Sequence, residues 1–204
     1  MIHIINYGLG NLGSIKNMLK RIGVEAEIID KPEQLEDASK IILPGVGAFD
    51  SGMSHLIDNN WLEILNRKVL TDKLPVLGIC LGMQLMTKGS EEGALPGLGW
   101  MNAKVKKFSF DEGSKLKIPH MGWNKVIPAK SSKLVEDPEN ENRFYFVHSY
   151  YVESENETES LFWTHHGLKF VSAFERDNIM GVQFHPEKSH KFGLKLLKNF
   201  VERY

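Results

Sequence analysis

A strand pattern runs directly into a helical pattern in Pro75-Val76-Leu77-Gly78-Ile79-Cys80-Leu81-Gly82-Met83-Gln84-Leu85-Met86. The first part is a short apolar run, which predicts a buried strand, and the second has apolar residues at helical spacing. Gly78 and Gly82 flank Cys80 at two positions on either side, which is the spacing of a nucleophile elbow. Glycines there leave room for the strand and the helix to cross. The stretch therefore predicts that Cys80 ends a strand and precedes a helix.

Upstream of this unit, short apolar runs alternate with helical patterns. Strands are expected over Ile2–Asn6, Val24–Ile29, Ile41–Leu43 and Val76–Ile79, and helices over Leu12–Ile22, from Pro32, and within Ser51–Leu70. Such alternation predicts an α/β fold with an open, mostly parallel sheet flanked by helices on both faces. Functional loops then leave the carboxyl ends of the strands.

From Trp100 onward the pattern changes to shorter strand candidates. They cover Ala103–Phe110, Arg143–Val152, Lys169–Phe174 and Ile179–Phe184, and an amphipathic helix is expected over Phe192–Val201. We expect these strands to extend or flank the parallel core as additional antiparallel strands. The polar segment Glu136 to Asn142 is expected to form a loop. A chain of 204 residues with 42% apolar residues is consistent with one domain over residues 1–204.

The composition excludes several classes of function. Twenty-five basic and 26 acidic residues give a formal net charge of -1, so no nucleic acid and no anionic membrane surface is expected as a partner. No stretch approaches the roughly 18 apolar residues of a membrane helix. Cys80 is the single cysteine, which excludes an intramolecular disulfide and favours a reducing, cytoplasmic location.

A second glycine-rich motif favours a different class of enzyme. Gly8-Leu9-Gly10-Asn11-Leu12-Gly13 follows a predicted strand and precedes a helix, and Asp30 ends the next strand. This is the pattern of a dinucleotide site in a nicotinamide-dependent oxidoreductase. Such a site needs a second mononucleotide-binding half, however, and the strand–helix alternation stops after Val76. Tight turning without a ligand is the other explanation of these glycines.

A base for the cysteine is found in Val182-Gln183-Phe184-His185-Pro186-Glu187. This segment ends the last predicted strand, so His185 is expected at the sheet edge that also carries Cys80. His185 would accept the thiol proton and later protonate a departing amine, while Glu187 would orient the imidazole. Alternatively, Cys80 is an inert buried thiol and the His-Pro-Glu turn only begins a helix.

Several motifs closely resemble the class I glutamine amidotransferases. They are Pro44-Gly45-Val46-Gly47, Gly78-Ile79-Cys80-Leu81-Gly82-Met83-Gln84 and Gly181-Val182-Gln183-Phe184-His185-Pro186-Glu187-Lys188-Ser189. Other segments resemble the glutaminase subunits of the imidazole glycerol-phosphate synthases of histidine biosynthesis, namely Tyr7-Gly8-Leu9-Gly10-Asn11-Leu12, Pro119-His120-Met121-Gly122-Trp123-Asn124 and Phe146-Val147-His148-Ser149-Tyr150-Tyr151. The resemblance implies one type 1 glutamine amidotransferase domain over residues 1–204.

This resemblance implies a glutaminase with a Cys80, His185 and Glu187 triad and a γ-glutamyl thioester intermediate. It places the oxyanion donors at Val46 and Leu81, where a peptide near Val46 needs to flip. It assigns glutamine binding to Gly45, Gly47, Gln84, Ser149 and Tyr150. No metal and no cofactor is implied.

The resemblance also implies a heterodimer with a (βα)8-barrel cyclase, which uses channelled ammonia to make imidazole glycerol phosphate and AICAR. The partner-facing positions are Asn11, Met121, Trp123 and Lys188. Asn6 stands where the family usually has Asp, and the segment Leu161 to Lys169 also departs from the family pattern. A paralogous glutaminase that feeds another synthase, such as a surface-sugar amidotransferase, therefore stays open, as does an inactive interaction module.

Overall fold

The computed structural model describes residues 1–135 and 142–204. Its strands are β1 (Ile2–Ile5), β2 (Ala26–Ile29), β3 (Lys40–Gly45), β4 (Val76–Cys80), β5 (Ala103–Lys107), β6 (His120–Pro128), β7 (Asn142–His148), β8 (Tyr150–Ser154), β9 (Ser160–His166), β10 (Leu168–Arg176) and β11 (Ile179–Val182). The helices are α1 (Leu12–Arg21), α2 (Phe49–Asp58), α3 (Trp61–Asn66), α4 (Leu81–Leu85) and α5 (His190–Arg203). The loop predicted over Glu136 to Asn142 lies outside the described residues, except for Asn142, which begins β7.

The strands form one mixed sheet with the order β2-β1-β3-β4-β11-β10-β9-β6-β7, and β5 and β8 join it through β10. The pairs from β2 to β11 are parallel, whereas β10 pairs antiparallel with β11 and β9. This arrangement confirms the predicted α/β class with a parallel core and additional antiparallel strands.

Two strand predictions are wrong. The last strand, β11, does not join the sheet as a purely antiparallel strand, because it pairs parallel with β4 on one side. A hairpin turn at Asp177, which has φ 53°, reverses the chain after β10 and gives β11 the direction of the parallel core. The strand predicted over Arg143–Val152 is two strands, β7 and β8, which separate at Ser149 and pair with different neighbours.

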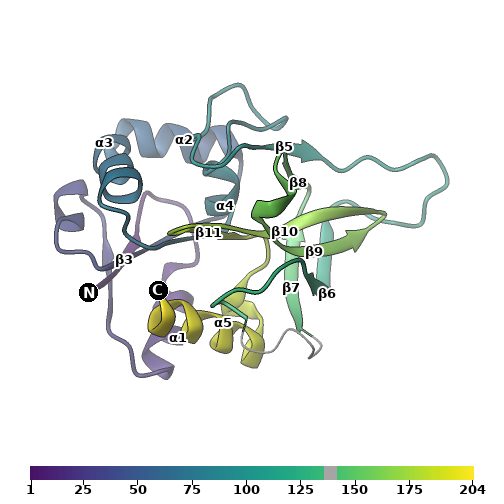
Figure 1. Cartoon of the computed structure of the whole chain (residues 1–204). Helices are drawn as coiled ribbons and strands as arrows, with labels where there is room; N and C mark the ends of the chain where they lie inside the picture. Colours follow the sequence, from purple (N-terminus) through teal and green to yellow (C-terminus); the bar gives the residue numbers. More distant parts are fainter. Residues whose placement is uncertain (136–141) are drawn as a thin grey trace.

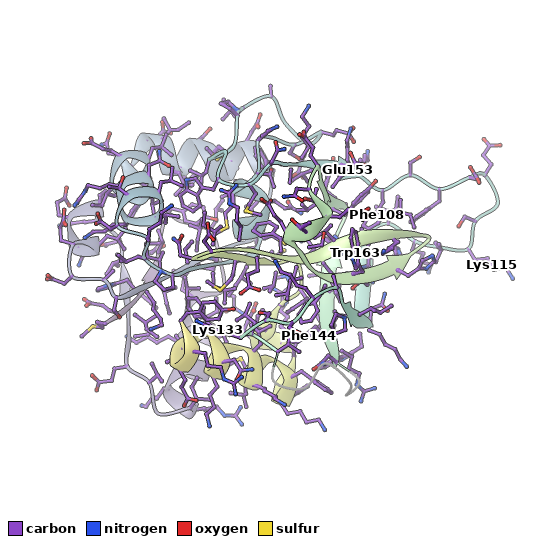
Figure 2. All side chains as sticks on the ribbon, viewed as in Figure 1. Phe108, Lys115, Lys133, Phe144, Glu153 and Trp163 are labelled. Carbon is purple, nitrogen blue, oxygen red and sulfur yellow. The ribbon has the colours of Figure 1, made fainter. Side chains whose placement is uncertain are left out.

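Helices cover both faces of the sheet (Figure 1), with α2 and α3 on one side and α1 and α5 on the other. Side chains that alternate along β3 explain this layering. Ile41 and Leu43 pack into the core on the α2 and α3 side, whereas Ile42 packs into the core that includes α1 and α5. Phe144 lies on the α5 side of the sheet (Figure 2). Its ring stacks on that of Phe184, with the ring centroids 3.8 Å apart.

The parallel strands end together at one edge of the sheet. Gly45 of β3 lies opposite Cys80 of β4, and Val182 of β11 lies opposite Ile79. The loops that follow β3, β4 and β11 therefore leave from the same edge, as expected for an open α/β sheet. None of the helices in the described ranges has the length and apolar character that a membrane crossing requires.

Candidate active site

Cys80 lies at a sharp turn between β4 and α4. Its backbone has φ 54° and ψ -108°, a strained conformation for a residue with a side chain. The flanking glycines are needed because the helix crosses the strand closely. A β-carbon at Gly78 would lie 2.8 Å from the Met83 nitrogen, and one at Gly82 would collide with the Leu43 carbonyl oxygen. The structure thus has the elbow geometry that the glycine spacing predicts.

A substitution at Gly82 tests this crossing. We expect Gly82→Ala to lower the free energy of unfolding by about 3 kcal/mol and the Tm by roughly 10 °C, because the new methyl group meets main-chain atoms that have no room to move. Thermal melting followed by circular dichroism measures the effect. Gly13→Ala is the matched control, since a β-carbon there meets no atom within 4 Å. Equal Tm values for the two variants would contradict the close crossing.

His185 and Glu187 form a buried pair at the carboxyl edge of β11. His185 Nδ1 donates a hydrogen bond of 2.8 Å to Glu187 Oε1, and both side chains are 2% exposed. The second ring nitrogen, Nε2, has no hydrogen-bond partner among the described residues. It is therefore the nitrogen available for proton transfer, while Glu187 fixes the tautomer and the ring orientation.

The charges around His185 favour its protonated form. Burial alone would lower the pKa of His185, but its interactions with Cys80 and Glu187 outweigh burial and raise the pKa from 6.5 to about 10. A protonated imidazole beside the sulfur can later give its proton to a leaving group. This arrangement supplies both a nucleophile and a proton donor for an amine leaving group.

A cavity of about 360 Å³ opens in front of the cysteine. Most of the predicted site residues line it: Val46, Gly47, Cys80, Leu81, Gln84, Ser149, Tyr150 and His185. Two do not, because Gly45 is in β3 opposite Cys80 and Glu187 binds His185 at its Nδ1. The cavity wall also includes Glu92, Pro119, Val147 and His148, for which no role in the site is predicted from the sequence.

Gln183 is a functional candidate for which the sequence alone predicts no role. Its Nε2 donates to Cys80 Sγ over 3.7 Å, and its Oε1 accepts a hydrogen bond of 2.9 Å from Gln84 Nε2. Gln84 Nε2 also donates to the Tyr150 carbonyl. Gln183 lies just after the end of β11, and its contacts with Cys80 and Gln84, which are distant in sequence, left no local signal that could have identified it.

A directed chain of hydrogen bonds connects the cavity to β6. His148 Nδ1 donates to the Tyr150 carbonyl over 2.7 Å, so its Nε2 accepts from His120 Nδ1 over 2.9 Å. His120 Nε2 in turn accepts from Asn124. Burial is the main reason that the pKa values of His120 and His148 are lowered to about 4 and about 3. Both rings are therefore neutral at neutral pH, and the direction of the chain is fixed.

The predicted partner positions lie on exposed parts of the chain. Met121 and Trp123 are 62% and 43% exposed on β6, and Asn11 and Lys188 are also exposed. The Trp123 ring stacks on His190 at 5.6 Å. Exposed large apolar side chains are typical of a protein interface.

The glycine-rich motif near the N-terminus forms a tight turn. Gly8 and Gly10 have φ values of 94° and 130°, and a β-carbon on Gly8 would lie 2.7 Å from His55 Nδ1. Backbone conformation and packing therefore account for two of its glycines without a dinucleotide. In the described part of the chain, His, Cys, Asp and Glu form no group that could hold a metal ion.

Comparisons with known proteins agree with this geometry. The family described as glutamine amidotransferase class-I matches residues 3–204. The chain is 55% identical over 203 residues to imidazole glycerol phosphate synthase subunit HisH 2 of Methanococcus maripaludis, covering 100% of both chains. It is 48% identical over 202 residues to HisH 2 of Pseudomonas aeruginosa, covering 99% of each.

Solved structures show the same fold at lower identity. A crystal structure of a glutamine amidotransferase matches with a TM-score of 0.76 and 20% identity, over 98% of this chain and 97% of that one. The structure of PurLQS from Thermotoga maritima matches with a TM-score of 0.67 and 16% identity, over 98% and 96% of the two chains.

Proposed function

The chain belongs to the class I glutamine amidotransferases as a HisH-type glutaminase subunit of imidazole glycerol phosphate synthase, and we propose that Cys80, His185 and Glu187 are its catalytic residues in histidine biosynthesis. The observation that carries this assignment is the buried His185–Glu187 hydrogen bond beside a cysteine on a strained elbow. The cavity in front of these groups is of a size that suits an amino acid.

The reaction proceeds in two stages. The Cys80 thiolate attacks the carboxamide carbon of glutamine, and the C–N bond breaks as the His185 imidazolium gives its proton to the departing nitrogen. Ammonia and a γ-glutamyl thioester result. His185 then accepts a proton from water, which attacks the thioester, and glutamate leaves as the C–S bond breaks and the thiolate returns.

Charge develops on the carbonyl oxygen in both stages, so N–H donors must face it. The Leu81 N–H at the start of α4 and the Val46 N–H are the proposed donors. The proposed glutamine-binding residues lie at the end of β3 and just after it, in α4, and where β7 gives way to β8. They are Gly45, Gly47, Gln84, Ser149 and Tyr150. The Gln84 hydrogen bond to the Tyr150 carbonyl supports placing these residues in one site.

The proposed partner is a (βα)8-barrel cyclase that binds as a heterodimer over Asn11, Met121, Trp123 and Lys188. A sealed interface would keep ammonia from reaching water before it meets the acceptor. The match over residues 3–204 supports treating the chain as one amidotransferase domain. The cytoplasmic location stays a prediction from the single cysteine.

We expect the isolated chain to hydrolyse glutamine slowly and the complete synthase to hydrolyse it about 100-fold faster or more, because removal of one oxyanion donor costs that much. Glutamate release is measured with and without the barrel synthase of the same organism and its phosphorylated substrate. Trp123→Ala should weaken the stimulation. Leu70→Ala is the control, because this exposed residue precedes β4 and is remote from the site.

The possible results distinguish an error in the proposed acceptor enzyme from an error in the proposed glutaminase reaction. Full glutaminase activity of the isolated chain would contradict the proposal that the partner stimulates glutamine hydrolysis. A chain whose Cys80 reacts with a glutamine-like electrophile, but which the barrel synthase never stimulates, would point to a different acceptor enzyme, such as a surface-sugar synthase.

A further inference from the structure

The Tyr7 hydroxyl is a buried polar group with no hydrogen-bond partner in the described part of the chain. Tyr7 follows β1, and its side chain is 2% exposed. Its oxygen lies against the main chain of Gly45, because a β-carbon on Gly45 would collide with it. A buried, unpaired hydroxyl destabilises the resting structure, and such groups in native proteins call for an explanation.

Tyr7 can act only as a hydrogen-bond donor or acceptor and not as a base. Burial raises the pKa of its phenol far above the ordinary value of 10, and the neighbouring Cys80 raises it further. The hydroxyl therefore keeps its proton at any pH where the enzyme works, and the proton is available for donation.

The nearby segment 45–47 can supply an acceptor if one peptide rotates. Gly45 lies opposite Cys80, Gly47 has φ 113°, and Val46 between them is 42% exposed. A turn of the Gly45–Val46 peptide changes ψ of Gly45 and φ of Val46, and the glycine makes its part of the change at low cost. Because the carbonyl and the N–H of a peptide point in opposite directions, a turn that aims the Val46 N–H into the cavity aims the Gly45 carbonyl away from it.

Tyr7 contacts β3 from outside the cavity. Val46 and Gly47 line the cavity, whereas Tyr7 does not, although its hydroxyl contacts Gly45. We propose that Tyr7 is a positioning residue whose hydroxyl donates to the Gly45 carbonyl once the peptide has turned, and so holds the Val46 N–H toward the oxyanion. This inference rests on the proposed function of Cys80 and Val46.

The test is Tyr7→Phe in the complete synthase. The expected result is a fall in kcat of about three- to tenfold, the effect of one neutral hydrogen bond, with little change in KM for glutamine. Alkylation of Cys80 by iodoacetamide should keep its rate, because that reaction forms no oxyanion; Cys80 is the single cysteine, so the readout is specific. The Tm should be unchanged or about 2–4 °C higher, since an unpaired buried group is removed.

Tyr204→Phe is the matched control. The Tyr204 hydroxyl donates to Glu175 and lies 3.2 Å from Ser132 Oγ, remote from the cavity. This variant should lose stability and keep kcat, which is the opposite of Tyr7→Phe.

Three results would overturn the proposal. The first is an unchanged kcat in Tyr7→Phe. The second is a lower Tm or failure to fold, which would show that the hydroxyl stabilises the resting structure. The third is a parallel loss of iodoacetamide reactivity, which would show that the substitution acts on the Cys80 sulfur. Failure of the proposed function is distinguishable, because it would appear as glutaminase activity that persists in Cys80→Ala.

Discussion

Cys80→Ala is expected to lower glutaminase turnover of the complete synthase by roughly 10⁴-fold or more, because no other group can form the thioester. The measurement is glutamate release at saturating glutamine. The fold should persist, since the change removes one sulfur atom from a side chain that is 7% exposed, and the Tm should fall by no more than a few degrees.

Two controls make the result specific. Cys80→Ser keeps the shape of the side chain and should also be inactive, because an alcohol beside His185 is a much weaker nucleophile than a thiolate. Met83→Leu, a volume-conserving change in the same segment, should retain activity. Substantial turnover in Cys80→Ala would remove the assigned nucleophile, whatever the partner.

Glu187→Gln is expected to reduce kcat by about 10³-fold, because an amide holds the wrong tautomer and no longer stabilises the imidazolium. The pH dependence should change as well. In the wild-type chain, the raised pKa of His185, about 10, keeps the proton donor charged up to alkaline pH. Without the Glu187 carboxylate this pKa falls, so the alkaline loss of kcat should move to lower pH. Glu202→Gln is an exposed control that should show neither effect.

The same pair affects stability in a defined pH window. His185 has a folded-state pKa above its unfolded value of 6.5, so the folded chain binds more protons between pH 6.5 and about 10. The stabilisation from this group is complete below pH 6.5 and is lost as the pH rises through about 10. Urea unfolding across this range should show a shallower decline in Glu187→Gln. An identical decline in both proteins would contradict the stabilisation of His185 by Glu187.

The parts of the site that depend on local sequence could be predicted. Glycine spacing around Cys80 predicts the elbow, because the crossing of strand and helix is a short-range constraint. A predicted strand followed by His185 and Glu187 likewise predicts the base and its orienting group, because these residues are close in sequence. Parallel strands share one carboxyl edge, so the convergence of the two segments also followed from the pattern.

Features that depend on long-range pairing could not be predicted. The strand β6 has exposed apolar residues, including Met121, Trp123 and Ile127, so it lacks the polar and apolar alternation that identifies a half-buried strand. The break at Ser149 appears only because β7 and β8 pair with different neighbours. The roles of Gln183 and His148 arise from contacts with residues distant in sequence.

The strained backbone at Cys80 has a consequence for protein engineering. Glycine tolerates a φ of 54° better than any other residue, so replacing Cys80 by glycine would relieve the backbone strain while removing the proposed nucleophile. A directed-evolution experiment that ranks clones by heat tolerance alone would therefore not select against inactive variants. Selection for growth without added histidine would retain the strained turn.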